Sequence, residues 1–197
     1  MNPRPESADP EESDSGFRLG LLLFLASLTV FFGASIIGYL FIRLNSPLSP
    51  PPGHLALPRA LWASTGVLLV TGWALHMAHR QAQEGRIGEL RWWLGLSFGL
   101  GGGFIAIQFP CLLELWQSHR TALARQGGAL YGLTSVLIVL HGMHVLGGMA
   151  PLGLLAWRAW RHTLGPAPLD GVRGCALYWH FLEAIWIVLF GMFLITA

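Results

Sequence analysis

Residues 126–157 read QGGALYGLTSVLIVLHGMHVLGGMAPLGLLAW, and this stretch contains no Asp, Glu, Lys or Arg. About 20 apolar residues are enough to cross the hydrocarbon core of a bilayer as a helix. The stretch exceeds that length, which predicts a tilted helix or one that extends past the bilayer. A strand is excluded, because the run is long and its apolar and polar residues do not alternate.

Four further runs have the same character. With the first, they predict five transmembrane helices at about residues 19–42, 60–79, 92–115, 126–159 and 174–196. The whole chain is 53% hydrophobic and only 11% charged, whereas soluble domains carry about 25% charged residues. We therefore predict an all-α integral membrane bundle for residues 18–197, with almost no soluble domain.

The N-terminal segment, residues 1–17, is rich in acidic residues. It lacks the basic start of a secretory signal peptide, so we expect a short disordered tail. The net charge of +2 and the absence of a basic stripe argue against a nucleic-acid partner.

The distribution of arginine predicts the orientation. Five crossings would place these arginines on the side of the N-terminus: Arg4, Arg18, Arg80, Arg86, Arg91, Arg158, Arg161 and Arg173. The other side would receive Arg43, Arg59, Arg120 and Arg125. Cytoplasmic segments carry the excess of basic residues, so we expect the N-terminus inside and the C-terminus outside.

Two pairs of polar residues lie inside the predicted spans. His141 and His144 are three residues apart in the fourth span, as are His180 and Glu183 in the fifth, so each pair shares a helix face. At about 1.5 Å per residue, His144 and Glu183 would be the cross-helix pair closest in depth. The four residues form either a structural or proton-linked polar cluster, or a metal or haem site. Their offset depths and bulky neighbours favour the polar cluster.

Three other features have two interpretations each. His76, His79 and Arg80 end the second span, where they either lie at the membrane interface or contact an anionic lipid headgroup. Gly95, Gly99 and Gly103 recur at every fourth residue, which allows close helix packing within the chain or against another subunit. Cys111 and Cys175 form no CxxC motif, which favours buried free thiols over a disulfide.

Motifs for catalysis are missing from the sequence. It contains no glycine-rich phosphate loop and no HExxH, and no serine lies beside a plausible base. We therefore assign no catalytic, cofactor-binding or metal-binding residue to this chain.

The last two spans resemble subunit III of the haem–copper cytochrome c oxidases. The resemblance is carried by HGMHV (141–145) with Gly147 and Gly148, and by YWHFLE (178–183) with Trp186. Looser agreement extends over the first two spans, at Ser27, Phe31, Phe32, Tyr39, Ser64, Thr65 and Trp73.

The resemblance implies an accessory subunit without a redox centre in a bacterial-type inner membrane. Such a subunit packs on catalytic subunit I, which holds the haem and copper, stabilises it and binds phospholipid. Longer family members have seven helices, and this chain resembles a five-helix form. Leu28 stands where the family has a buried glutamate, and Pro110 and Cys111 stand near a second one.

Two alternatives remain open. A subunit III-like chain can serve a nitric oxide reductase, and the residues that distinguish the two complexes belong to the catalytic partner. From another class, the histidines would suit a small histidine-ligated membrane cytochrome, which would be coloured. A transporter would favour an inverted repeat or broken helices at the midplane, and neither is found in the sequence.

Overall fold

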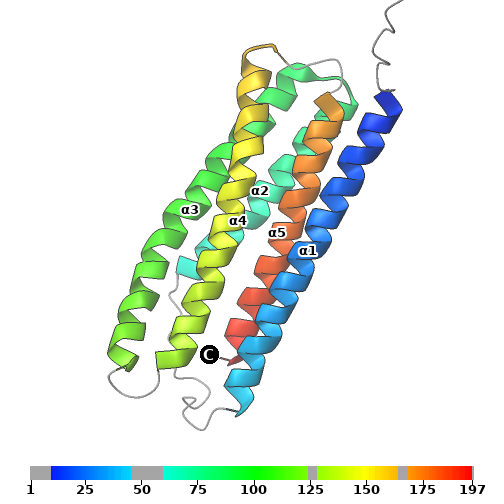
Figure 1. The fold of residues 1–197 in the computed structure, drawn as a ribbon. Helices are drawn as coiled ribbons and strands as arrows, with labels where there is room; N and C mark the ends of the chain where they lie inside the picture. The colour runs from blue at the N-terminus through cyan, green and yellow to red at the C-terminus, as the bar shows by residue number, and fades with distance from the viewer. Residues whose placement is uncertain (1–9, 46–59, 124–127, 164–167, 197) are drawn as a thin grey trace, which may run out of the picture.

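The computed structural model describes residues 10–45, 60–123, 128–163 and 168–196. These ranges form five helices and contain no strand (Figure 1). The helices are α1 (Pro10–Asn45), α2 (Ala60–Gln83), α3 (Ile87–Leu123), α4 (Gly128–Trp160) and α5 (Pro168–Thr196).

Each helix contains a segment that is long and apolar enough to cross a membrane. The five segments are Arg18–Asn45, Ala60–Gln83, Ile87–Glu114, Gly132–Trp160 and Leu169–Ile195. The prediction of an all-α bundle with five spans is therefore confirmed. The start of α1 and the end of α5 lie at opposite ends of the bundle, as an odd number of crossings requires (Figure 1).

Several helices are longer than the hydropathy pattern predicted. α1 begins at Pro10, so the last part of the predicted disordered tail, residues 10–17, is helical. α3 continues to Leu123 instead of ending near residue 115, and α5 begins at Pro168 instead of residue 174. Proline fits the first position of a helix, where its missing N–H costs nothing. Residues 1–9 of the predicted tail lie outside the described residues.

Four of the helices pack as a ring, in which each contacts two neighbours. α2 packs on α3 and α5, and α4 packs on the same two helices from the opposite side. α1 lies at the edge of the bundle beside α5 and contacts only α4 and α5 among the described helices (Figure 1). The edge α2–α5 and the edge α3–α4 are therefore opposite each other.

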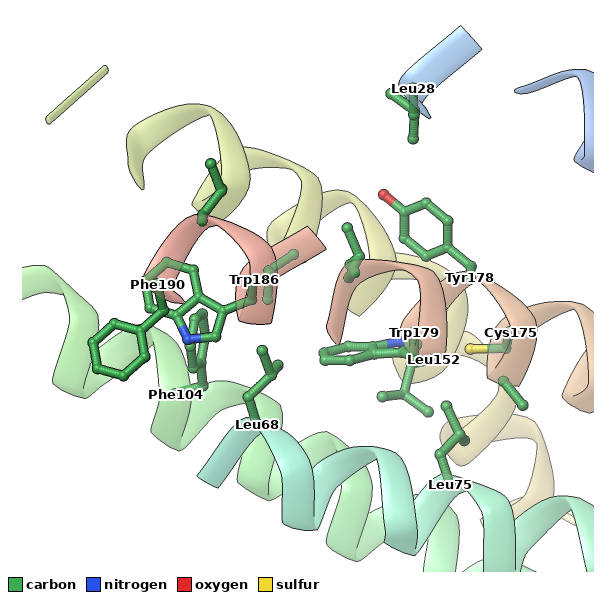
Figure 2. Close-up of a cluster of buried hydrophobic side chains, with 14 of the residues drawn as sticks. Leu28, Leu68, Leu75, Phe104, Leu152, Cys175, Tyr178, Trp179, Trp186 and Phe190 are labelled. Atoms are coloured by element: carbon green, nitrogen blue, oxygen red, sulfur yellow. The ribbon is translucent and has the colours of Figure 1, made fainter. Parts of the chain in front are cut away.

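The centre of the ring is filled by large side chains. Trp179 and Trp186 of α5 are fully buried, and Figure 2 shows them beside Leu68 and Leu75 of α2 and Phe104 of α3. Lipid supplies no hydrophobic drive for helices to associate, so this close packing is itself a main source of stability.

The turn between α2 and α3 is fixed by backbone hydrogen bonds around Gly85. The N–H of Gly85 donates to the carbonyl of Ala82 at 3.3 Å, and the N–H of Arg86 donates to Gln81 at 3.0 Å. This pattern needs a left-handed residue, and Gly85 supplies it with φ +69°. Arg91, one turn into α3, contacts His162 Nε2 at the end of α4 at 3.0 Å, which ties this end of the bundle together.

Hydroxyl groups inside the spans are satisfied mainly by their own helix. Thr29 donates to the carbonyl of Leu25 at 2.9 Å, Thr71 to Val67 at 2.8 Å and Ser97 to Trp93 at 2.8 Å. Such bonds to the preceding turn let hydroxyl side chains enter hydrocarbon without a partner on another helix.

Candidate functional site

The side chains of His180 and Glu183, both on α5, lie close enough to form an ion pair. The Nδ1 atom of His180 lies 2.8 Å from Oε2 of Glu183. The carboxylate points toward α2 and occupies the space that a side chain at Gly72 would fill. The second carboxylate oxygen, Oε1, is buried and has no hydrogen-bond partner among the described residues. Gly72 is thus required for the acid to fit between the two helices.

His141 of α4 lies in an aromatic environment. Its ring stacks on Trp186 with a centroid distance of 4.9 Å, and Phe104 and Phe32 approach at 6.1 and 6.4 Å. The side chain is fully buried, and neither ring nitrogen has a hydrogen-bond partner among the described residues. His141 therefore contributes mainly the shape and polarisability of its ring to a contact that joins α1, α3, α4 and α5.

His144 faces α1 rather than α5. Its Nδ1 lies 2.6 Å from the carbonyl of Leu140, and its ring packs edge-on against Phe32 at 5.2 Å. The backbone carbonyl of His144 accepts a hydrogen bond of 2.9 Å from the Tyr178 hydroxyl of α5. The tyrosine ring points away from the bundle centre toward Leu28 of α1 (Figure 2).

The structure therefore divides the four predicted cluster residues into two places. Glu183 pairs with His180 on its own helix and faces α2, whereas His144 faces α1 and makes no recorded contact with Glu183 in the described part of the chain. Depth alone suggested His144 as the partner of Glu183. Which residue Glu183 contacts depends on how each helix is rotated about its axis, and the depth of a residue in the membrane does not reveal this rotation.

A hydrogen bond between α2 and α5 was not anticipated from the sequence. The indole N–H of Trp186 donates to the Thr65 hydroxyl at 2.9 Å, and this hydroxyl donates in turn to the carbonyl of Leu61 at 2.7 Å. Both side chains appear in the family resemblance, but nothing in their spacing indicates that they meet. The relay satisfies a tryptophan donor that would otherwise be unpaired in hydrocarbon.

The three residues near the end of α2 have different surroundings. The ring of His76 lies 6.3 Å from that of His180, centroid to centroid. His79 accepts a hydrogen bond of 3.2 Å from the Gln83 amide on its Nε2, and its buried Nδ1 has no partner among the described residues. Arg80 is exposed and pairs with Glu84 at 3.1 Å.

The glycines at close helix contacts differ from those that the sequence suggested. Of the predicted set, a Cβ added at Gly95 would lie 3.5 Å from the Trp160 indole nitrogen, and one added at Gly99 or Gly103 would meet nothing within 4 Å. Besides Gly72, close approaches occur at Gly101, Gly148 and Gly153, where an added Cβ would lie 2.7 Å from Met149 Sδ, 2.7 Å from the Tyr178 ring and 2.8 Å from the Phe98 ring. Gly99 and Gly103 therefore do not mediate packing within the described chain, and packing of this repeat against another subunit stays a prediction.

Within the described residues, no group of three or more His, Cys, Asp or Glu side chains is placed to hold a metal ion. Cys111 and Cys175 are buried free thiols, as expected.

Grooves on the surface are lined mainly by apolar side chains. One groove, of about 440 Å³, runs between α1, α4 and α5 and is lined by residues that include Leu21, Pro151, Gly174 and Tyr178. An adjoining groove shares Leu21 and Gly174 with it and is bordered by Arg18, Asp170 and Arg173. Arg18 and Asp170 pair across this groove at 3.4 Å.

The described residues thus form a five-helix membrane bundle in which two hydrogen bonds inside the spans, from Tyr178 and from Trp186, join α5 to its neighbours. Comparison with known proteins identifies its family. The sequence model of cytochrome c oxidase subunit III matches residues 8–196. The chain therefore belongs to the cytochrome c oxidase subunit III family.

Curated relatives are similar over most of their length. Cytochrome c oxidase subunit 3 of Bacillus subtilis (strain 168) is 26% identical over 176 residues, which cover 87% of this chain and 82% of the relative. Probable cytochrome c oxidase subunit 3 of Mycobacterium tuberculosis (strain CDC 1551 / Oshkosh) is 30% identical, covering 87% and 84%. Cytochrome bo(3) ubiquinol oxidase subunit 3 of Pseudomonas putida is 27% identical, covering 87% and 82%.

Replacing His141 with phenylalanine tests whether its ring nitrogens matter. Because neither nitrogen has a described partner, His141→Phe should change the free energy of unfolding by less than about 1.5 kcal/mol. His141→Ala should cost about 3 kcal/mol, because it leaves a cavity beside Trp186. Thermal unfolding of the purified chain in detergent measures both. A loss of stability in His141→Phe as large as in His141→Ala would show that the nitrogens bind something.

Adjacent glycines in α4 provide a matched pair of variants. Gly148→Ala should destabilise the chain by about 1–3 kcal/mol, because the new methyl group overlaps the Tyr178 ring. Gly147→Ala should be neutral or slightly stabilising, since its methyl group would lie no closer than 3.9 Å to other atoms and alanine is the better helix former. Equal midpoints of thermal unfolding in the two variants would contradict the packing described above.

Proposed function

We propose that this chain is a non-catalytic accessory subunit of a haem–copper oxidase, packed on catalytic subunit I in a bacterial-type inner membrane. The observation that carries the proposal is the family match over residues 8–196, which includes all five spans. In this proposal the haem and copper belong to the partner, where the electron transfer of respiration takes place.

The polar contacts of the bundle support a structural role. Trp186 and Thr65 join α5 to α2, and Tyr178 joins α5 to α4. Glu183 packs against the glycine of α2 that leaves room for it. Each contact fixes one helix against another, so the chain offers the catalytic subunit a rigid surface. This rigidity is the physical basis on which it would stabilise its partner.

Lipid binding is the second part of the proposal. The groove between α1, α4 and α5 offers an apolar path for an acyl chain, and Arg18 and Arg173 lie at the adjoining groove. Basic side chains at this position attract an anionic headgroup. A second headgroup contact is proposed at the end of α2, where His79 and the exposed Arg80 lie.

The orientation predicted from arginine completes the proposal. We place the N-terminus in the cytoplasm and the C-terminus outside, because the ends of α2 and α4 and the starts of α3 and α5 then share the cytoplasmic side with Arg18. The relatives' names include both a cytochrome c oxidase and a ubiquinol oxidase. The proposal therefore concerns the accessory role, and it does not name an electron donor, because the catalytic partner determines which donor is used.

Purification of the tagged chain from its native membrane in a mild detergent tests the accessory role. We expect a haem-bearing polytopic subunit to co-purify, with phospholipid, and the separated chain itself to be colourless. Visible spectra and mass spectrometry identify both. A separated chain that keeps a haem spectrum would overturn the proposal in favour of a membrane cytochrome, and so would the failure of any haem-bearing subunit to co-purify.

Reporter fusions test the orientation. Alkaline phosphatase folds only outside the cytoplasm, since its disulfides form in an oxidising compartment. A phosphatase fused after residue 197 should be active, whereas one fused after Gly85, in the turn between α2 and α3, should be inactive. The reverse pattern would invert the proposed topology without affecting the accessory role.

A further inference from the structure

The edge between α2 and α5 carries ionisable side chains at the level of the hydrocarbon core. His180 and Glu183 lie near the middle of the span Leu169–Ile195, and Gly72, which the Glu183 carboxylate contacts, lies at the middle of Ala60–Gln83. His76 is one turn further along α2, about 6 Å from that level. On this estimate all of these residues lie within a core of about 30 Å, so His76 is placed inside the membrane, one turn from Arg80, and not at the interface expected from the sequence.

Two imidazole rings are exposed at this edge. The His180 side chain is 43% exposed although its Nδ1 is bound to Glu183, and His76 beside it on α2 is exposed as well. Their ring centroids are 6.3 Å apart. His180 Nε2 and both nitrogens of His76 have no recorded hydrogen-bond partner among the described residues. The edge therefore presents a pair of polar rings outward, and the buried Glu183 lies behind one of them.

Lipid cannot satisfy these rings. Acyl chains offer no hydrogen bonds, and an imidazole is too short to reach headgroups from near the midplane. The opposite edge, between α3 and α4, instead exposes apolar side chains such as Val139, Met143 and Leu146. Its polar side chain Gln108 also has no hydrogen-bond partner among the described residues, but it is buried. The exposed surfaces of the two edges thus differ in the surroundings that they require.

We propose that the α2–α5 edge is the surface that docks on the catalytic subunit, and that a transmembrane helix of that subunit supplies a carboxylate or amide oxygen to His76 and His180. This inference rests on the proposed accessory function and specifies which face of the chain contacts the catalytic subunit. An oxygen acceptor suits the site in the form where His180 pairs with the Glu183 carboxylate as an imidazolium, because its Nε2–H then points outward as a second donor. The neutral ring of His76 also has one N–H to donate. Hydrogen bonds of this kind between helices are a common means of association within membranes.

Photo-crosslinking in the intact purified complex tests the face directly. A benzophenone amino acid is placed at Leu69 of α2 or Ile187 of α5, which are exposed and flank the histidines, and at Met143 of α4 as the matched control. We expect adducts with the haem-bearing subunit from Leu69 and Ile187 and none from Met143. Mass spectrometry of the adducts identifies the partner peptide, which should carry the acceptor oxygen.

A substitution at His76 provides the second measurement, because this residue makes no hydrogen bond that folding of the described chain depends on. His76→Phe should make the chain dissociate from the complex about threefold to thirtyfold more readily, as expected for one lost hydrogen bond between membrane helices. His76→Gln, which keeps a donor, should restore most of the retention, and Met143→Phe should have no effect.

The outcomes separate this inference from the proposed function. Adducts with the haem-bearing subunit from Met143 alone would overturn the docking face and leave the accessory role intact. Adducts between two copies of this chain from Leu69 or Ile187 would assign the edge to self-association and overturn the inference. Adducts with lipid alone would do the same in favour of a lipid-facing edge. If no haem-bearing subunit co-purifies with the unmodified chain, both proposals fail together.

Discussion

The structure depends on the constraint that a donor or acceptor placed in hydrocarbon has only other protein groups to bond with. Trp186 meets this constraint at the centre of the bundle. Its N–H donates to Thr65 at 2.9 Å, and its ring stacks on His141 and meets Phe104 edge-on. One side chain of α5 thereby contacts α2, α3 and α4. The hydrogen bond and the ring contacts of Trp186 thus fix how α2, α3, α4 and α5 are rotated about their axes, and these four helices surround its side chain.

Small and acidic residues then decide how closely the helices approach. Gly72 leaves room for the Glu183 carboxylate, and Gly148 leaves room for the Tyr178 ring. A bulky residue at either position would push α5 away from a neighbour and weaken the contacts at Trp186. α1 makes fewer such contacts, which is consistent with its place at the edge and with the many large apolar side chains that it exposes.

The sequence predicted the number and type of the helices, because run length and missing charge are sufficient to decide them. It predicted their ends less well, since nothing in hydropathy stops a helix such as α3 where it leaves the membrane. It placed His180 and Glu183 on one face correctly, as a three-residue spacing requires. It did not reveal that His144 faces α1 or that Gly148, rather than Gly99, is packed. In a helix that is apolar on all sides, the pattern carries little information about rotation.

The same reasoning explains why polar side chains can remain exposed on this chain. A membrane protein that functions alone would gain stability by replacing His76 with an apolar residue, because its exposed nitrogens lose hydrogen bonds in lipid, whereas His180 is retained as the partner of the buried Glu183 carboxylate. Most hydroxyl groups of the bundle avoid that loss by bonding to the preceding turn, as Thr71 does with Val67. The His144 ring also bonds to its preceding turn, through Nδ1 and the carbonyl of Leu140, whereas His76 and Nε2 of His180 make no such bond among the described residues. The proposed docking on a second protein would give these exposed nitrogens the hydrogen-bond partner that lipid lacks.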